Sequence, residues 1–212
     1  RGHTPAGRLP SVRVRVDDAT FVNNHRTPTR DEVAAVLEQM DGWPKLATLL
    51  LAATGARVGE IASLRWGAVD LAEGWIRVVG KTGPRDIPVP RGVVDELRRV
   101  GPGPGDAPVL GKAESTVIVG LQHRFLPRAC EAAGVARFTP HGLRRLASMT
   151  LADAGVDVAT YAALLGHSPA VAIRRYQEVT PERRRKAAAA ALLGVFSEEP
   201  KVVEFPGQRK PR

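Results

Sequence analysis

The sequence predicts an α+β fold that is mainly α-helical, with a small antiparallel β-sheet or hairpin near its middle. Two observations carry this prediction. Apolar residues recur at helical spacing over most of the chain, and only the region around Gly80 has the β-rich, turn-punctuated pattern of a hairpin. With 43% hydrophobic and 5% aromatic residues among 212, the chain can bury one sizeable core, built mostly from leucine, valine and alanine.

Three helices are expected in the first third of the chain. Thr29 precedes Glu32 at the spacing of a capping box, which marks a helix start. Trp43–Pro44 opens the next helix, and Thr54–Gly55 interrupts it. The expected helices cover residues 29 to about 40, 43 to 53, and 58 to about 66.

The only clear β pattern follows these helices. Two β-rich segments, Trp75–Val79 and Arg85–Val89, flank the turn residues Gly80–Pro84. This arrangement predicts a hairpin, or a three-stranded meander if Val69–Leu71 joins it. Pro88 cannot donate a hydrogen bond to a neighbouring strand, so it indicates an edge strand.

The second half of the chain is expected to be helical after a Gly- and Pro-rich loop at residues 101–108. Gly134 and Gly155 stand where two of these helices should end, as C-terminal caps. The expected helices cover about 115–133, 141–154, 157–165, 170–177 and 181–193.

Both ends of the chain are expected to lie outside the folded domain. Residues 1–28 are rich in Arg, Pro, Gly and Asn and predict a mobile linker or arm, in which 12–16 could form a short strand. The folded domain then covers 29–196, and a polar, mobile tail covers 197–212. The chain begins without Met, so we expect a fragment or a processed piece.

Charge and cysteine content narrow the function. A formal net charge of +9 points to a polyanionic partner, in the first place nucleic acid; a basic surface that binds nothing is the alternative. Cys130 is the only cysteine, which excludes an intrachain disulfide and a cysteine zinc site and suits a reducing, cytoplasmic compartment. The sequence has no apolar run long enough to cross a bilayer and no apolar signal region, so no membrane association is expected.

Two arginines are candidates for binding a phosphodiester. His141 and Arg144 lie three residues apart just after Pro140, so both project from one face at the start of a predicted helix. Arg57 stands upstream, in a second motif. Arginine offers a planar fork of donors that matches two phosphate oxygens, so Arg57 and Arg144 could clamp one phosphodiester. The alternative is that either arginine is an ordinary surface ion-pair partner.

Tyr176 is the candidate nucleophile. A phenol with a pKa near 10 attacks poorly unless cations or a base activate it. Arg174 and Arg175 adjoin Tyr176, and His141 or His167 could accept its proton. The alternative is a packing role, which we expect instead for the other tyrosine, at position 161.

Lys81, at the tip of the predicted hairpin, could protonate a departing alkoxide. The alternative is a solvated turn lysine. Glu60 falls one helical turn after Arg57 and could orient Arg57 or His141. The sequence has no cluster with metal-ligand spacing and no nucleotide-binding motif, so no cofactor is expected.

Four segments, taken together, resemble the tyrosine recombinase (phage integrase) family. They occur in the order of the family's motifs and cover roughly residues 28 to 180. They are the first arginine box at Thr54–Trp66, the hairpin lysine motif at Gly80–Pro90, the second box at Thr139–Arg144, and the third box with the tyrosine at Leu164–Tyr176.

The resemblance implies the catalytic-domain fold of that family and a site-specific recombinase that cleaves and rejoins double-stranded DNA without a metal. Tyr176 would attack the scissile phosphate and form a 3′-phosphotyrosyl intermediate. Lys81 would act as general acid for the 5′-oxygen and His141 as acid and base near the phosphate. The groups implied to stabilise the transition state are Arg57, Arg144 and His167.

The resemblance also implies a homotetramer on DNA and, we expect, a monomer when free. A helix after the tyrosine would dock on a neighbouring subunit through an apolar end, or fold back on its own domain. The candidate docking residues are Leu192, Leu193, Val195 and Phe196.

Two departures from the family pattern stand out. Arg145 occupies a position where many relatives have His, outside the catalytic set. Residues 1–28 are too short for the N-terminal DNA-binding domain that relatives usually carry, so the chain resembles the catalytic domain alone.

Two further functions remain as alternatives. One is relaxation of DNA by a type IB topoisomerase-like activity, which needs nearly the same groups. The other is a catalytically silent DNA-binding module.

Overall fold

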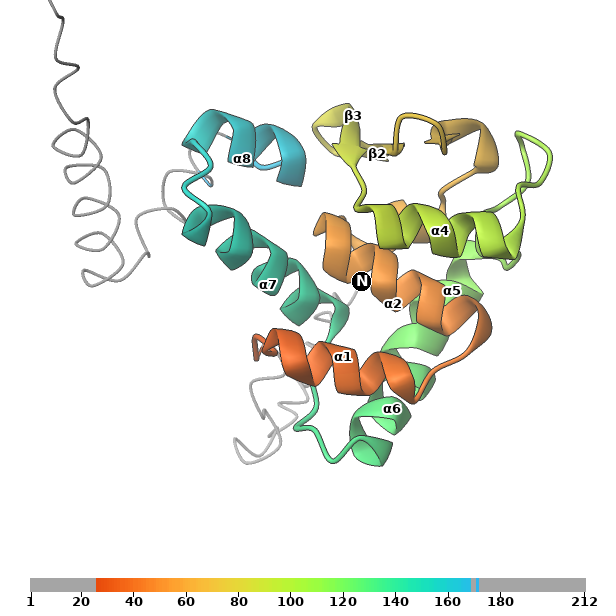
Figure 1. Cartoon of the computed structure of the whole chain (residues 1–212), viewed down its shortest axis with the longest axis vertical. Coiled ribbons are helices and arrows are strands. Elements are labelled where there is room, and N and C mark those ends of the chain that lie inside the picture. Colours follow the sequence, from red (N-terminus) through yellow and green to blue (C-terminus); the bar gives the residue numbers. More distant parts are fainter. Residues whose placement is uncertain (1–25, 169–170, 172–212) are drawn as a thin grey trace, which may run out of the picture.

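The structure, a computed structural model, describes residues 26–168 and residue 171. Within these residues, a small sheet lies at one edge of a mainly helical body, as Figure 1 shows. The α-helices are α1 (Arg30–Glu38), α2 (Gly42–Thr54), α3 (Val58–Ala62), α4 (Arg91–Val100), α5 (Glu114–Gly120), α6 (Leu126–Ala132), α7 (Pro140–Asp153) and α8 (Val158–Leu165).

The sheet is an antiparallel meander in the order β1–β2–β3, with β1 at Val69–Asp70, β2 at Trp75–Gly80 and β3 at Gly83–Pro88. β2 and β3 form a hairpin in which Gly80 pairs with Gly83, leaving a two-residue turn. This confirms the predicted three-stranded meander. Pro88 lies on β3, at the edge of the sheet, as its missing N–H requires.

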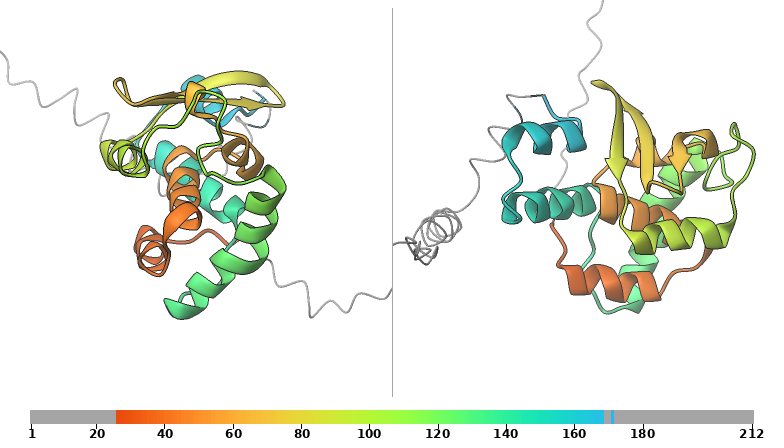
Figure 2. Two further views of the ribbon diagram at one scale, coloured as in Figure 1. Left: turned by 90° about the vertical axis from the view of Figure 1, so that its right-hand side faces the viewer. Right: turned by 45° about the horizontal axis from the view of Figure 1, so that its top comes forward.

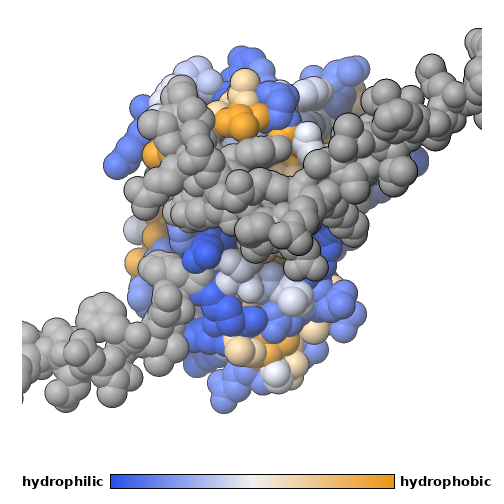
Figure 3. All heavy atoms as spheres, turned by 90° about the vertical axis from the view of Figure 1, so that its left-hand side faces the viewer, coloured by the Kyte–Doolittle hydropathy of each residue, from blue (hydrophilic) through white to orange (hydrophobic). Residues whose placement is uncertain are grey.

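Helix α2 lies in the middle of the molecule and contacts α1, α3, α4 and α7 (Figure 1). Leu46, Leu50 and Leu51 on this helix are at most 1% exposed. Full burial of such a side chain stabilises a fold by about 1.5–3 kcal/mol. The face in Figure 3 agrees with an internal core, because the described residues visible there are mostly hydrophilic, with separate hydrophobic patches.

Helix α8 lies beside the hairpin and against the end of α7 (Figure 2). Its buried side chains, Tyr161 and Leu165, form a small cluster of their own, separate from the main core. The hydroxyl of Tyr161 is hydrogen-bonded to Ser148 on α7. Tyr161 is therefore a core residue, as its sequence context predicts.

Local signals account for most of the helix boundaries. Thr29 caps α1 through the predicted capping box, in which its hydroxyl accepts the backbone N–H of Glu32 and the Glu32 carboxylate accepts that of Thr29. Gly134 and Gly155 follow α6 and α7 in the left-handed conformation, as predicted.

Helix α3 is shorter than predicted, because tertiary hydrogen bonds replace its last turn. It ends at Ala62, and a 3₁₀ turn follows at Trp66–Ala68. The loop at 101–110 pairs with the segment between them: the Leu64 carbonyl accepts from Val109, and the Trp66 N–H donates to Ala107.

The long helix expected near 115–133 is interrupted by a π-helical turn, Leu121–Phe125, between α5 and α6. Pro127 follows directly at the start of α6 and has no N–H to continue the α-helical ladder.

Helix α4 was not expected from the sequence. Its buried residues Val93, Val94 and Leu97 lie on one face, at the spacing of an amphipathic helix. That periodicity is the signal that could have revealed it.

Several expectations fall outside the described residues. They concern the linker up to residue 25 with its possible strand at 12–16, the helices at 170–177 and 181–193, Tyr176, and the tail at 197–212. Across residues 26–168, none of the helices combines the length and apolar character that a membrane-spanning helix needs.

The central position of α2 makes its stability contribution testable. Leu50→Ala should lower the free energy of unfolding by about 2–5 kcal/mol, because it opens a cavity in the core. Val119→Ala is the control, since Val119 is 58% exposed and the change should stay within about 0.5 kcal/mol. Urea unfolding followed by circular dichroism measures both, and similar losses would contradict the assigned core.

Candidate active site

Gly55 ends α2 and forms the turn that leads into the site. Its φ is 63°, in the left-handed region that glycine adopts without steric cost. A Cβ at this position would lie 2.6 Å from Cδ2 of Leu165 and 2.9 Å from Cβ of Ala147. Gly55 therefore lets α7 and α8 approach the turn closely, and Arg57 follows two residues later.

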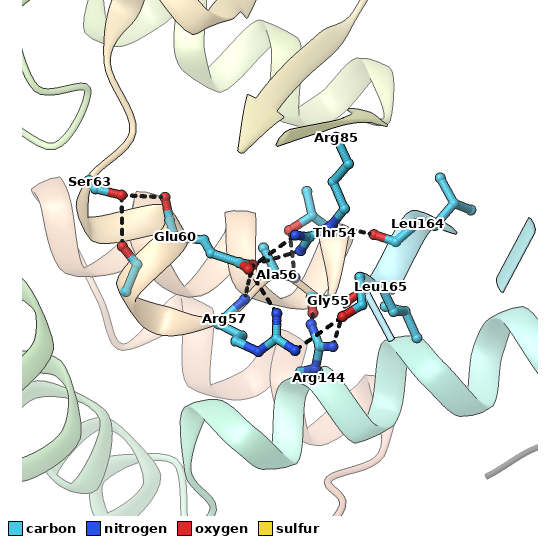
Figure 4. Close-up of polar contacts among 12 residues, drawn as sticks. Thr54, Gly55, Ala56, Arg57, Glu60, Ser63, Arg85, Arg144, Leu164 and Leu165 are labelled. Carbon is cyan, nitrogen blue, oxygen red and sulfur yellow. Dashed lines mark hydrogen bonds and ion pairs between the residues drawn. The ribbon is translucent and has the colours of Figure 1, made fainter. Parts of the chain in front are cut away.

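Glu60, on the first turn of α3, is buried and is the shared acceptor of the site (Figure 4). Its Oε2 accepts the backbone N–H of Arg57 at 2.8 Å, and its Oε1 accepts from the Arg57 guanidinium at 2.9 Å. The guanidinium of Arg85, from β3, donates to both oxygens at 3.0 and 2.6 Å. The contact with Arg57 is the one that an orienting role for Glu60 requires.

The ionised form of Glu60 is favoured despite its burial. Burial raises the pKa of a carboxyl because the buried charge loses its hydration. Hydrogen bonds from Arg85 and from Arg57 outweigh this effect and hold the pKa of Glu60 below its usual value of 4.5. Since an unpaired buried carboxylate is costly, Glu60 and the two arginines stabilise one another.

Arg144 is a buried cation on the first turns of α7, with 6% of its surface exposed. Its Nη1 donates to the carbonyl of Gly55 at 2.6 Å, and its Nη2 donates to the carbonyl of Leu165 at 2.5 Å. Burial and the neighbouring charge of Arg57 lower the pKa of Arg144 to about 10. Arg144 therefore remains protonated at neutral pH, and its guanidinium is fixed in direction.

The C-terminal end of α8 brings the three arginines together. Its consecutive carbonyls each accept one guanidinium donor: Leu164 from Arg85 at 2.9 Å, Leu165 from Arg144, and Gly166 from Arg57 at 3.1 Å. The last carbonyls of a helix lack partners within the helix and carry the negative end of its dipole. Three cations therefore satisfy this end of α8 and attach it to the α2–α3 turn, α7 and the hairpin.

The resulting cluster suits an anion. Figure 4 shows the guanidinium groups of Arg57 and Arg144 side by side, between α3 and α7. With Arg85, three guanidinium cations face one carboxylate, so the cluster has a formal excess of two positive charges. The side chain of Arg57 is 39% exposed, so an anion can reach it from solvent.

The histidines expected at the site lie on the elements that hold the arginines. His141 is exposed on the first turn of α7, one turn before Arg144. His167 directly follows Gly166, and its backbone N–H bonds to the carbonyl of Ala162 at 3.0 Å.

Lys81 lies in the exposed turn between β2 and β3. The residue before it, Gly80, packs against the cluster: a Cβ there would overlap Oε1 of Glu60 and lie 3.0 Å from Nη1 of Arg85. The absence of a side chain at Gly80 thus lets the hairpin approach Glu60.

The structure brings Arg57, Glu60 and Arg144 into one cluster and places His141, His167 and Lys81 on elements that border it. Tyr176, the sixth predicted catalytic residue, lies outside the described residues.

Arg85 belongs to the cluster, although it was not among the site residues predicted from the sequence. The signal was available in the strand pattern. Arg85 lies two residues before the buried Ile87 and pairs with the buried Val78, so it occupies an inward position on β3. A charged side chain at an inward strand position calls for a buried partner.

Comparison with known proteins shows the family to which the chain is related. Residues 26–183 match the model of the phage integrase family. The chain is 33% identical over 181 residues to tyrosine recombinase XerA of Thermococcus kodakarensis, covering 78% of this chain and 62% of that protein. It is 30% identical over 192 residues to tyrosine recombinase XerC of Corynebacterium efficiens, covering 84% of this chain and 57% of that protein.

Solved structures give the same fold. A crystal structure of XerA recombinase matches with a TM-score of 0.62 at 24% identity, over 78% of this chain and 64% of that one. The Tn1549 transposon integrase in complex with transposon right end DNA matches with a TM-score of 0.63 at 20% identity, over 78% of this chain and 66% of that one.

The fold is that of a tyrosine recombinase catalytic domain, and the chain belongs to the phage integrase family. It spans about three fifths of the length of the XerA and XerC proteins named above.

The ionised state of Glu60 predicts a pH-dependent stability. Its pKa is lowered on folding, so its contribution is present above pH 4.5 and is lost as pH falls through the folded-state pKa. Glu60→Gln should lower the free energy of unfolding by about 3–5 kcal/mol at pH 7, because it leaves Arg85 without its buried partner. The difference in the free energy of unfolding between the unchanged protein and Glu60→Gln should shrink at low pH.

The matched control is Asp86→Asn, which removes the exposed carboxylate that pairs with Arg77. Urea unfolding of all three proteins at pH 7 and at a series of pH values that fall from 4.5 measures the effect. A Glu60→Gln deficit that is the same at both pH values would mean that Glu60 does not act as a buried anion.

Proposed function

We propose that this chain is the catalytic domain of a site-specific DNA recombinase that cleaves and rejoins DNA through a 3′-phosphotyrosyl intermediate. One observation carries the proposal: Arg57 and Arg144 lie side by side, each oriented by fixed protein acceptors, in a cluster with excess positive charge. A phosphodiester carries one negative charge, and a second develops as an oxygen nucleophile adds to phosphorus. Preorganised donors aimed at such a charge stabilise the transition state more than the ground state.

Tyr176 is the proposed nucleophile. Its phenolic oxygen bonds to phosphorus, and its proton passes to a neighbouring histidine; we assign this acid and base role to His141. The bond from phosphorus to the 5′-oxygen breaks, and the Lys81 ammonium donates a proton to that oxygen. His167 acts with Arg57 and Arg144 on the phosphate. Rejoining reverses these steps on a new strand, and the phosphotyrosine bond conserves the energy of the phosphodiester.

Double-stranded DNA is the proposed substrate. The net charge of +9 supports a polyanionic partner, and a solved relative in the same fold is a transposon integrase in complex with DNA. The relatives named XerA and XerC are recombinases, which favours recombination over the topoisomerase-like alternative.

A silent DNA-binding module is less well supported. Burying Arg144 beside Arg57 costs free energy, as the lowered pKa of Arg144 indicates. A scaffold that only binds DNA gains little from that arrangement, whereas a transition state with added negative charge offsets the cost.

The proposed assembly is a homotetramer on DNA, formed from free monomers. The proposed docking segment carries the apolar residues Leu192, Leu193, Val195 and Phe196. An apolar groove of about 510 Å³ between α1, α2, α4 and α7 is a described surface that could receive such a segment. It is lined by side chains that include Val33, Leu37, Leu49 and Leu151.

The nucleophile is tested with a nicked DNA substrate that traps the covalent intermediate. The unchanged protein should form a covalent protein–DNA adduct, and Tyr176→Phe should form none while binding DNA with nearly the same affinity. Tyr161→Phe is the matched control at the other of the two tyrosines; because Tyr161 is buried, that variant should still form the adduct. An adduct in the Tyr176→Phe variant would refute the assignment.

The arginine pair is tested by single-turnover cleavage. Arg57→Ala should slow cleavage by roughly 100- to 1,000-fold, the usual effect of removing one preorganised donor. Arg77→Ala, on the outer face of the hairpin and 64% exposed, should leave the rate within a few-fold. Equal effects of the two changes would show that Arg57 acts only through overall charge.

A further inference from the structure

Arg85 holds the hairpin to the rest of the site. Its side chain is 9% exposed, and all three of its nitrogens are engaged. The two Nη atoms donate to the two oxygens of Glu60, and Nε donates to the carbonyl of Leu164. One residue of β3 therefore fixes the hairpin both to α3 and to the C-terminal end of α8.

No other inward side chain holds the hairpin near its tip. Val78 is the last buried apolar residue of β2, and beyond it the inward positions are taken by glycine. Gly80 and Gly83 form the pair that closes the turn, so neither can pack an apolar side chain against the core. Arg85, opposite Val78, is the anchor nearest the tip.

Two glycines shape the space around this anchor. A Cβ at Gly80 would lie 3.0 Å from Nη1 of Arg85, and a Cβ at Gly166 would lie 2.8 Å from the same atom. The guanidinium therefore fits between the hairpin and the end of α8, where its place leaves no room for a side chain at either position.

Lys81 lies next to this anchored region, one residue after Gly80 and four residues before Arg85. A two-residue turn keeps a fixed register with its strands, so the position of the turn follows the position of the strand ends. Fixing Arg85 against Glu60 and Leu164 thereby fixes where the Lys81 side chain begins.

We propose that Arg85 is a positioning residue for strand cleavage, which holds the hairpin so that Lys81 can protonate the leaving 5′-oxygen. This rests on the proposed function, in which Lys81 is the general acid. Arg85 acts through the hairpin and does not contact the phosphate, since its side chain is only 9% exposed and each of its nitrogens already donates to Glu60 or Leu164. A general acid contributes only when it stays within hydrogen-bonding reach of the leaving atom.

The experiment compares two leaving groups in single-turnover cleavage. In one DNA substrate the bridging 5′-oxygen is replaced by sulfur. A thiol has a pKa of about 8.5, so a thiolate leaves without help from an acid. Loss of Lys81, or loss of its position, should therefore matter for the oxygen substrate and hardly at all for the sulfur substrate.

Lys81→Ala and Arg85→Gln should each slow cleavage of the oxygen substrate by at least about 100-fold, the lower range for a general acid. Both variants should cleave the sulfur substrate at a rate within a few-fold of that of the unchanged protein. Arg57→Ala is the matched control: it should stay slow on both substrates, because it removes stabilisation of the phosphate charge.

The outcomes separate the two proposals. Suppose that Arg85→Gln still cleaves the sulfur substrate slowly while Lys81→Ala recovers its rate on that substrate. This result overturns the positioning role and leaves the proposed function intact. Arg85→Gln that is as fast as the unchanged protein on oxygen does the same. Lys81→Ala that fails to recover on sulfur removes Lys81 as the acid, and an unchanged protein that forms no adduct removes the proposed function itself; the inference falls with either.

A second variant and a second measurement guard against misfolding. Arg85→Lys keeps a charge beside Glu60 but cannot make the forked contact and reach Leu164 as well. It should keep the thermal midpoint closer to that of the unchanged protein than Arg85→Gln does, and should show the same recovery on sulfur. Amide hydrogen exchange without DNA should quicken at residues 78–85 in this variant while α2 is unaffected; unchanged exchange in the hairpin would overturn the anchoring role.

Discussion

The buried carboxylate of Glu60 is the interaction on which the rest of the site depends. It accepts hydrogen bonds from α3, where Arg57 begins the helix, and from the inward side chain of Arg85 on the hairpin. A single negative charge at this depth makes it possible to gather three guanidinium groups whose mutual repulsion would otherwise separate them. Burial in this cluster lowers the pKa of Arg144 to about 10, so Arg144 stays cationic at neutral pH.

The backbone contributes as much to the cluster as the side chains do. Arg144 is held by carbonyls alone, from the turn after α2 and from the end of α8. Glycines at positions 55, 80 and 166 allow the three surrounding segments to meet at distances that a Cβ would forbid. Segments far apart in the chain thus converge by close backbone packing, and the arginines fill the polar space that remains.

Much of this was predictable from the sequence, and the misses have physical causes. The order of the motifs gives the fold, and the capping box and the hairpin turn give local boundaries. Pairing with the 101–110 loop shortens α3, and no local propensity reports such a tertiary contact. Composition alone does not distinguish Arg85 from the other basic residues of the hairpin. Only its position on the strand shows that its side chain points inward. The excess charge of the cluster also could not be predicted, because it depends on how close the arginines and Glu60 lie in space, and spacing along the chain does not give those distances.

Helix α8 is attached to the molecule in an unusual way. Its apolar residues pack within a small cluster with the end of α7, while its C-terminal carbonyls are held to the main body by guanidinium groups. Salt screens exposed charges far more than buried ones, and Arg85 and Arg144 are at most 9% exposed. These buried arginines therefore hold α8 in place at high ionic strength as well as at low, so the shape of the arginine cluster does not follow the salt concentration of its surroundings.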